Sequence, residues 1–131
     1  MAQHPAQLGR WHELLATRDI DRLDTLLAED AVFHSPIVHT PQRGRELVKM
    51  YLAAAFHVLV NDSFHYVRQV VDGNDAVLEF QVLVDGIQVN GVDMIHWNEA
   101  GEIADFKVMV RPLKAINLLQ ERMRQMLEKL G

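Results

Sequence analysis

Four consecutive runs of alternating apolar and polar residues occupy the second half of the chain and constrain its fold more than any other feature. They cover approximately residues 64–72, 76–84, 87–97 and 103–111. Alternation with a period of two is typical of β-strands that bury one face. Short turn-forming segments join the runs, and one of them, Asp85-Gly86, is a strong hairpin signal. The pattern predicts a four-stranded antiparallel meander.

Apolar residues at helical spacing lie before and after this meander. Three helices are predicted before it, with stripes of Leu8, Trp11, Leu14 and Leu15, of Ile20, Leu23, Leu26 and Leu27, and of Leu47, Met50, Tyr51, Ala54 and Val58. Asp19 or Asp21 could cap the second helix, and the third covers 46–59. Residues 31–34 predict a short strand, and Pro36 and Pro41 make 35–44 a loop. A tail helix over 113–130 carries the stripe Leu113, Ile116, Leu119, Met123 and Met126 or Leu127.

Helices followed by a curled antiparallel sheet indicate the α+β class, with the helices covering one face of the sheet. The 131 residues fit a single domain, 1–131, and their 49% hydrophobic and 24% charged content is ordinary for a globular protein. The net charge of −5, with scattered basic residues, predicts no nucleic-acid partner. No apolar stretch approaches the roughly 20 residues of a membrane span. The chain has no cysteine and no signal-peptide pattern, so we expect a cytoplasmic protein.

Asp93 is the candidate functional residue, because it is a carboxylate in an otherwise apolar strand face. By alternation it shares that face with Ile87, Val89, Gly91, Ile95 and Trp97. An ionised carboxylate in an apolar wall is costly unless it is paired, protonated or hydrated. Such groups are found mainly at sites of chemistry or binding. The alternative is a structural acid that accepts a hydrogen bond from a buried hydroxyl or a loop amide.

The neighbouring strands extend this face into one apolar wall, formed by Ala76, Leu78, Phe80, Val82 and Val84 and by Ala104, Phe106, Val108 and Val110. A concave wall that faces helices is a common place for a ligand pocket. The opposite face mixes charged residues with Val77, Leu83, Val92, Met94 and Met109. A partly apolar outer face predicts a homodimer through the sheet.

Several stretches, in this order, resemble the SnoaL-like branch of the nuclear transport factor two-like superfamily: 27–36 (LAEDAVFHSP), 44–47 (GREL), 91–93 (GVD) with 101–103 (GEI), and 110–113 (VRPL). The resemblance covers about residues 8–112, and the helix 113–130 extends beyond that core. It implies a cone-shaped bent sheet wrapped around helices, a deep apolar pocket, and dimers through the outer face. Members include polyketide cyclases, ketosteroid isomerases and limonene epoxide hydrolases, so the fold alone does not decide the function.

The resemblance also implies roles for particular residues. Asp93 matches the acid/base aspartate of the SnoaL-like cyclases. The aspartate–arginine–aspartate set of the epoxide hydrolases has no counterpart, and Asp93 with Tyr51 imitates the ketosteroid isomerase site only in part, since a second acid is missing. His34 could shuttle a proton or instead bond a loop carbonyl. Tyr51 could donate its phenol to a ligand or instead lie at the core edge.

We therefore predict Asp93, His34 and Tyr51 as catalytic residues. The predicted pocket wall is Phe33, Leu47, Phe80, Val82, Val89, Ile95, Trp97, Phe106 and Val108. The seven histidines lack the i, i+4 spacing of a zinc helix, so we expect neither metal nor cofactor. Two functions remain open: a cofactor-independent isomerase or cyclase acting on a small apolar carbonyl compound, and a non-catalytic dimeric protein that binds an apolar molecule in the same pocket.

Overall fold

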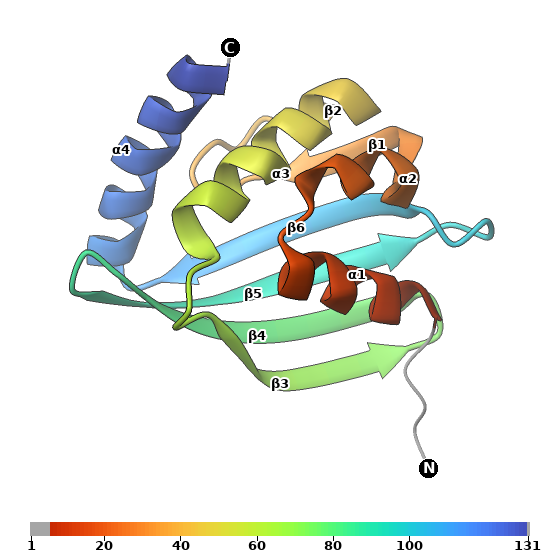
Figure 1. The fold of residues 1–131 in the computed structure, drawn as a ribbon, viewed down its shortest axis with the longest axis horizontal. Coiled ribbons are helices and arrows are strands. Elements are labelled where there is room, and N and C mark those ends of the chain that lie inside the picture. The colour runs from red at the N-terminus through yellow and green to blue at the C-terminus, as the bar shows by residue number, and fades with distance from the viewer. Residues whose placement is uncertain (1–5, 131) are drawn as a thin grey trace.

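A curved, open six-stranded sheet with all helices on one face makes up the computed structural model, which describes residues 6–130 (Figure 1). The order of strands across the sheet is β2-β1-β6-β5-β4-β3. The helices are α1 (Ala6–Thr17), the 3₁₀ turn η1 (Ile20–Arg22), α2 (Leu23–Leu26), α3 (Arg45–Leu59) and α4 (Leu113–Leu130). The strands are β1 (Leu27–His34), β2 (Gln42–Arg43), β3 (His65–Asp72), β4 (Asp75–Val84), β5 (Ile87–Trp97) and β6 (Ile103–Arg111). None of the helices within 6–130 has both the length and the apolar composition to cross a membrane.

The predicted α+β class and antiparallel meander are confirmed. Strands β3 to β6 pair in succession, each antiparallel to the next. At the β4–β5 hairpin, Asp85 and Gly86 have φ values of 50° and 78°, the left-handed backbone that this two-residue turn requires. Strand β1 then adds to the meander in parallel with β6.

The first part of the chain differs from the prediction in three details. The first strand begins at Leu27, so that Leu27 ends no helix and instead pairs with Ile103. The loop 35–44 contains β2, since its last residues pair with Val32 and Phe33. Asp19 stands at the N-terminus of η1 but makes no side-chain capping hydrogen bond. The start of β1 and the presence of β2 both depend on pairing with distant residues, which local periodicity does not reveal.

The buried stripes of α3 and α4 agree with those predicted only in part, since Ala54 and Leu119 are buried as predicted. In α3 the buried face centres on Val48, Leu52 and Phe56, whereas Leu47 is 36% exposed. Apolar residues surround most of α3, so periodicity alone does not select the side that meets the sheet. In α4 the buried residues are Ala115 and Leu119, whereas Leu113 is 70% exposed.

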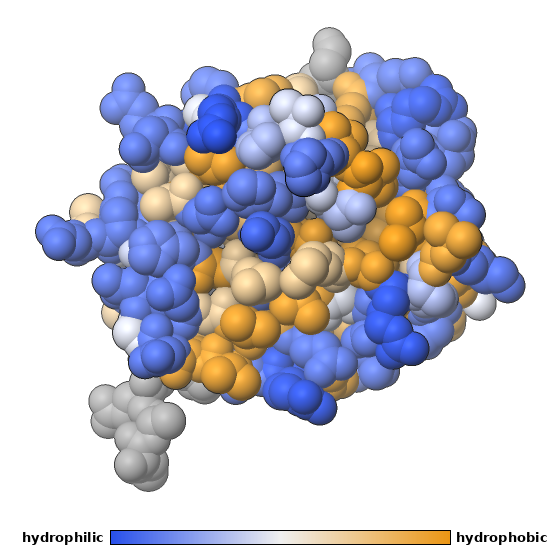
Figure 2. Space-filling model, turned by 180° about the vertical axis from the view of Figure 1, so that it is seen from behind, coloured by the Kyte–Doolittle hydropathy of each residue, from blue (hydrophilic) through white to orange (hydrophobic). Residues whose placement is uncertain are grey.

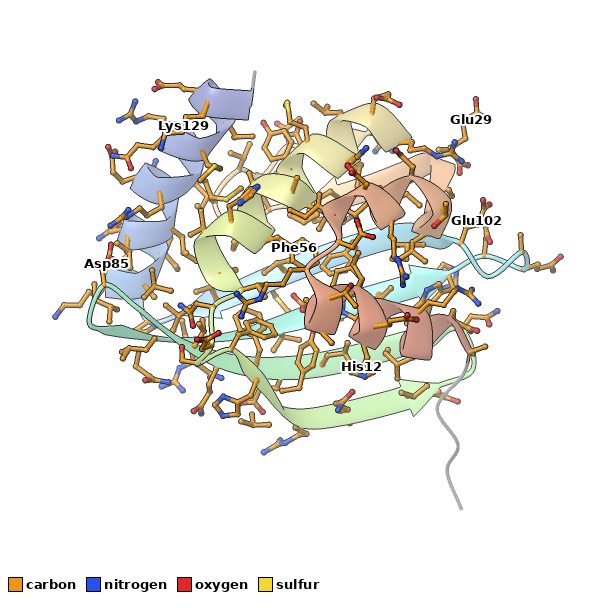
Figure 3. The ribbon with its side chains drawn as sticks, in the orientation of Figure 1. His12, Glu29, Phe56, Asp85, Glu102 and Lys129 are labelled. Carbon is orange, nitrogen blue, oxygen red and sulfur yellow. The ribbon has the colours of Figure 1, made fainter. Side chains whose placement is uncertain are left out.

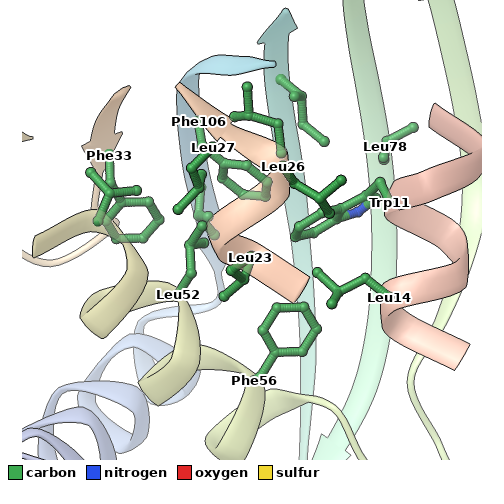
Figure 4. Packing of buried hydrophobic residues seen from close by; sticks show 14 of the residues in the cluster. Trp11, Leu14, Leu23, Leu26, Leu27, Phe33, Leu52, Phe56, Leu78 and Phe106 are labelled. Atoms are coloured by element: carbon green, nitrogen blue, oxygen red, sulfur yellow. The ribbon is translucent and has the colours of Figure 1, made fainter. Parts of the chain in front are cut away.

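The core lies between the inner face of the sheet and the helices. Phe56 points from α3 into this layer (Figure 3). Trp11 of α1 packs its ring against Phe56 and Phe106, with centroids 5.6 and 5.0 Å apart (Figure 4). Directly opposite Phe80 in the β4–β5 ladder stands Gly91, where an added Cβ would lie 2.3 Å from the Phe80 ring. The glycine therefore allows the ring to lie flat across β5.

The outer face of the sheet carries exposed apolar side chains. Figure 2, which views this face, shows them gathered across its middle with polar residues around them. The large exposed members include Val70, Val77, Leu83 and Met109, which are 56%, 38%, 49% and 50% exposed. They come from β3, β4 and β6, so the apolar surface spans the meander.

Candidate functional site

A cavity of about 60 Å³ lies between the inner face of the sheet and helices α1, α3 and α4. Most of its wall is apolar, with Phe33, Phe56, Phe64, Phe80, Phe106 and Val108 among the lining residues. The lining residues that carry polar side-chain atoms are Asp93, Ser35 and Trp11. Within residues 6–130, Asp93 is the one ionisable side chain in this lining.

Strand β5 places Asp93 in the wall of this cavity. Its neighbours across the sheet are Leu78 of β4 and Val108 of β6, and the residue is 7% exposed. Loss of hydration raises the pKa of the carboxyl from 3.8 to about 7, although a hydrogen bond from Tyr66 acts in the opposite direction. Both protonation states are therefore populated at neutral pH, as a group that accepts and returns a proton requires.

Two aromatic residues form a hydrogen-bonded chain behind Asp93. The Tyr66 hydroxyl of β3 donates to Asp93 Oδ2 over 2.7 Å, and the Trp11 indole N–H donates to the Tyr66 oxygen over 3.0 Å. Burial and the nearby carboxylate raise the pKa of Tyr66 well above 10, so the phenol keeps its proton. The structural alternative considered for Asp93, a bond from a hydroxyl of the protein, is thus present, and its donor Tyr66 is outside the cavity lining.

Ser35 is a second polar residue in the cavity lining. It stands in the loop after β1, where its Oγ accepts hydrogen bonds from the backbone N–H groups of Ile37 at 3.0 Å and Val38 at 3.4 Å. These two donors use the oxygen as an acceptor and leave its proton for donation. Pro36 and Ile37 line the same cavity.

The structure does not bring His34 and Tyr51 to Asp93. Phe33 faces the cavity, so its neighbour His34 points to the other side of β1, where Nε2 lies 2.9 Å from Asp105 Oδ2. Tyr51 packs at the edge of the core with its ring 6.1 Å from that of Phe33, and it is outside the cavity lining. This geometry argues against the catalytic roles predicted for both residues.

The predicted pocket wall divides into three groups. Phe33, Phe80, Phe106 and Val108 line the cavity. Four more are buried on the same inner face but pack in the core outside the lining: Val82, Val89, Ile95 and Trp97. Leu47 lies on the exposed side of α3. The cavity occupies only part of the inner face because helix side chains fill the rest, and the strand alternation does not reveal which part.

The sequence analysis missed Trp11, Tyr66 and Ser35 as site residues. Helix α4, which extends beyond the family core, adds Leu119 and Met123 to the lining. Tyr66 follows Phe64 by two residues in a predicted strand, which is a usable signal for the same face. The pairing of β3 shifts register between Tyr66 and Arg68, so the alternation along that strand is broken. Between residues 6 and 130 the acidic and histidine side chains form no group of three that could hold a metal ion.

Comparison with known proteins gives the family. The family's sequence model, that of the SnoaL-like domain, matches residues 8–106, which is more than half of the chain. The chain belongs to the SnoaL-like family. It has the fold of the nuclear transport factor two-like superfamily, as the resemblance in its sequence implied.

Solved structures with the same fold include two that are closely similar in sequence. A steroid delta-isomerase from Pseudomonas aeruginosa is 42% identical, with a TM-score of 0.90 over 95% of this chain and 91% of that chain. An uncharacterised protein with a cystatin-like fold from Silicibacter pomeroyi is 36% identical, with a TM-score of 0.85 over 94% of this chain and 85% of that chain. An NTF2-like protein of unknown function from Mesorhizobium loti is 19% identical, with a TM-score of 0.71 over 86% and 100%. No curated protein sequence matches this SnoaL-like chain.

Proposed function

We propose that this SnoaL-like protein is a cofactor-independent isomerase that moves a double bond in a small apolar carbonyl compound, with Asp93 as the proton-transferring group. The observation that carries the proposal is a single carboxyl with a pKa of about 7 in an apolar cavity. Proton transfer by a positioned side chain is most efficient when its pKa lies near the working pH. The 42% identical steroid delta-isomerase supports the reaction class.

The reaction needs one base and no co-reactant. In a β,γ-unsaturated ketone, the Asp93 carboxylate takes a proton from the carbon between the carbonyl and the double bond. The electron pair moves onto the carbonyl oxygen and gives a dienolate. Asp93 then returns the proton to the γ-carbon, and the electrons flow back to form the conjugated α,β-unsaturated ketone. Nothing is oxidised or reduced.

Ser35 is the proposed donor to the oxygen on which charge develops. Its oxygen already accepts two backbone N–H groups, so its hydroxyl proton is available to a dienolate in the cavity. A donor aimed at the developing charge stabilises the transition state more than the ground state. Asp93 and Ser35 thus form the pair of polar groups that this chemistry requires.

The size of the cavity favours a small substrate. Its volume of about 60 Å³ is well below the roughly 300–1,000 Å³ of pockets that enclose drug-sized ligands. A monocyclic enone therefore fits this form better than a tetracyclic steroid, unless α4, which supplies Leu119 and Met123, moves outward.

The test is an absorbance assay for the conjugated product, with a β,γ-unsaturated cyclohexenone and a β,γ-unsaturated 3-ketosteroid as alternative substrates. We expect Asp93→Asn to abolish turnover, and Ser35→Ala to lower kcat by about 10²-fold, as loss of one oxyanion donor does. Asp105→Asn is the matched control, because Asp105 is an acid on the outer face and pairs with His34. An Asp93→Asn variant with full turnover would remove Asp93 from the mechanism.

A non-catalytic binding protein is the second candidate. It is favoured by the bond from Tyr66 to Asp93, which satisfies one carboxyl oxygen within the protein, and by the few polar groups in the lining. In that case the same ketones would shift the thermal midpoint of the protein without being converted.

We further propose that the protein forms a homodimer through the apolar surface on the outer face of the sheet. The exposed side chains of Val70, Val77, Leu83 and Met109 support this assignment, and dimer interfaces are more apolar at their centres than ordinary surfaces. Its cytoplasmic location remains a prediction from the sequence.

A further inference from the structure

We propose that Trp11 and Tyr66 determine which oxygen of Asp93 carries the exchangeable proton: Oδ2 is held as a permanent acceptor, and Oδ1 gains and loses the proton. The role of this proton in catalysis rests on the isomerase function proposed above. The position of the proton is a property of the protein without substrate, and it follows from the direction of two hydrogen bonds.

Trp11, at the far end of the hydrogen-bonded series, sets the direction of both hydrogen bonds. An indole N–H only donates, so Trp11 Nε1 occupies the Tyr66 oxygen as an acceptor over 3.0 Å. A phenol has one proton, and that proton cannot point back at another N–H. It points instead to the remaining partner, Asp93 Oδ2 at 2.7 Å. Trp11 therefore orients the Tyr66 hydroxyl toward Asp93 in both protonation states of the carboxyl.

The consequence for Asp93 is an unequal pair of oxygens. A proton on Oδ2 that pointed at Tyr66 would meet the Tyr66 proton along the same short contact, and one that pointed elsewhere would leave Tyr66 only a hydroxyl oxygen to donate to, which is a weaker acceptor than a carbonyl oxygen. The favoured form of protonated Asp93 therefore has its O–H on Oδ1 and its carbonyl oxygen at Oδ2. Since Asp93 lines the cavity while Tyr66 is outside that lining, the assignment leaves Oδ1 for a bound molecule.

The position of Tyr66 in the fold keeps this arrangement rigid. Trp11 comes from α1, Tyr66 from β3 and Asp93 from β5, and the Trp11 ring is packed between Phe56 and Phe106. The Tyr66 ring also meets Phe64 edge-on with centroids 5.3 Å apart, and His12 of α1 at 5.7 Å. Trp11 and Tyr66 are thus positioning residues that act through Asp93.

Infrared spectroscopy tests the assignment directly, because the carbonyl stretch of a protonated carboxyl falls in frequency when its oxygen accepts a hydrogen bond. The Asp93 band is isolated as the difference between pH 6 and pH 9, and Asp93→Asn identifies it by its loss. We expect Tyr66→Phe to raise the carbonyl frequency and to move the titration midpoint upward by about one pH unit, since a hydrogen bond to the ionised form is lost. Trp11→Phe should broaden the band, because the hydroxyl is then free to turn.

The chain contains a matched control for each variant, since it has two tyrosines and two tryptophans. Tyr51→Phe removes a hydroxyl at the edge of the core, and Trp97→Phe removes an indole from the inner face of β5. Neither control should change the carbonyl frequency. If Tyr66→Phe does not fold, 3-fluorotyrosine incorporated into Tyr51→Phe labels Tyr66 alone. The fluorinated phenol is a stronger donor and should lower the frequency.

An unchanged carbonyl frequency in Tyr66→Phe, or in the fluorotyrosine protein, would overturn the assignment, because the carbonyl oxygen would then not be Oδ2. The measurement needs no substrate, so a protein that fails to isomerise any ketone can still show the predicted shift. Conversely, an active isomerase whose Asp93 band ignores Tyr66 would keep the proposed function and lose this inference.

Discussion

Replacement of Asp93 by asparagine should stabilise the protein at alkaline pH. The pKa of Asp93 is raised by burial, from 3.8 to about 7 in the folded protein, so the folded state binds the proton more tightly than the unfolded state. The contribution of Asp93 to the free energy of unfolding is therefore fully present below about pH 4 and is lost as the pH rises through 7. A difference of about three pKa units corresponds to about 4 kcal/mol at 1.36 kcal/mol per unit.

Asparagine removes this dependence because it imitates the protonated acid. Its carbonyl can accept the Tyr66 hydroxyl and its amide takes the place of the O–H on the cavity side. Part of the 4 kcal/mol is already lost by pH 5, where the unfolded aspartate is mostly ionised. Between pH 5 and pH 9 the wild-type protein should thus lose about 3 kcal/mol more stability than Asp93→Asn.

Urea denaturation at several pH values measures this difference. The matched control is Asp72→Asn, an exposed acid at the end of β3, whose stability should follow that of the wild type across the range. Parallel curves for Asp93→Asn and the wild type between pH 5 and pH 9 would refute the argument that burial destabilises the charged form of Asp93.

Four further predictions concern activity, packing and assembly. If Asp93 is the base, kcat/KM should rise with pH to a plateau above its pKa of about 7, and a pH profile that falls through 7 would instead make it the acid. Gly91→Ala should cost roughly 1–3 kcal/mol in urea denaturation and weaken ketone binding, because the new Cβ pushes the Phe80 ring into the cavity. His34→Ala should leave turnover unchanged in the absorbance assay, since His34 pairs with Asp105 outside the cavity lining, and a large loss would restore its predicted role. Met109→Lys, at a residue that is 50% exposed, should convert the proposed dimer to a monomer in sedimentation analysis, and an unchanged mass would contradict an interface at this surface.

The four-stranded meander was predictable because its signals are local. Alternation identified the four strands of the meander, and Asp85-Gly86 located a hairpin that the structure forms with two left-handed residues. The inward direction of Asp93 followed from the same alternation. Each of these features depends on residues that are close together in the sequence.

The assembly of the site was not predictable in this way. Asp93 meets Tyr66 across 27 positions and Tyr66 meets Trp11 across 55, so neither bond leaves a local pattern. His34 was assigned to the pocket from its place beside a loop, although the alternation from Phe33 turns it outward. For Tyr51, periodicity identified a helix but did not select the side of it that faces the cavity.

The most direct test of the whole account is a ¹³C NMR titration of the Asp93 carboxyl carbon in the protein without ligand, assigned by its loss in Asp93→Asn. We expect a single transition with a midpoint at a pKa of about 7. A midpoint near 4, the value of a hydrated aspartate, would show that the carboxyl is not desolvated in an apolar cavity and would contradict the proposed site.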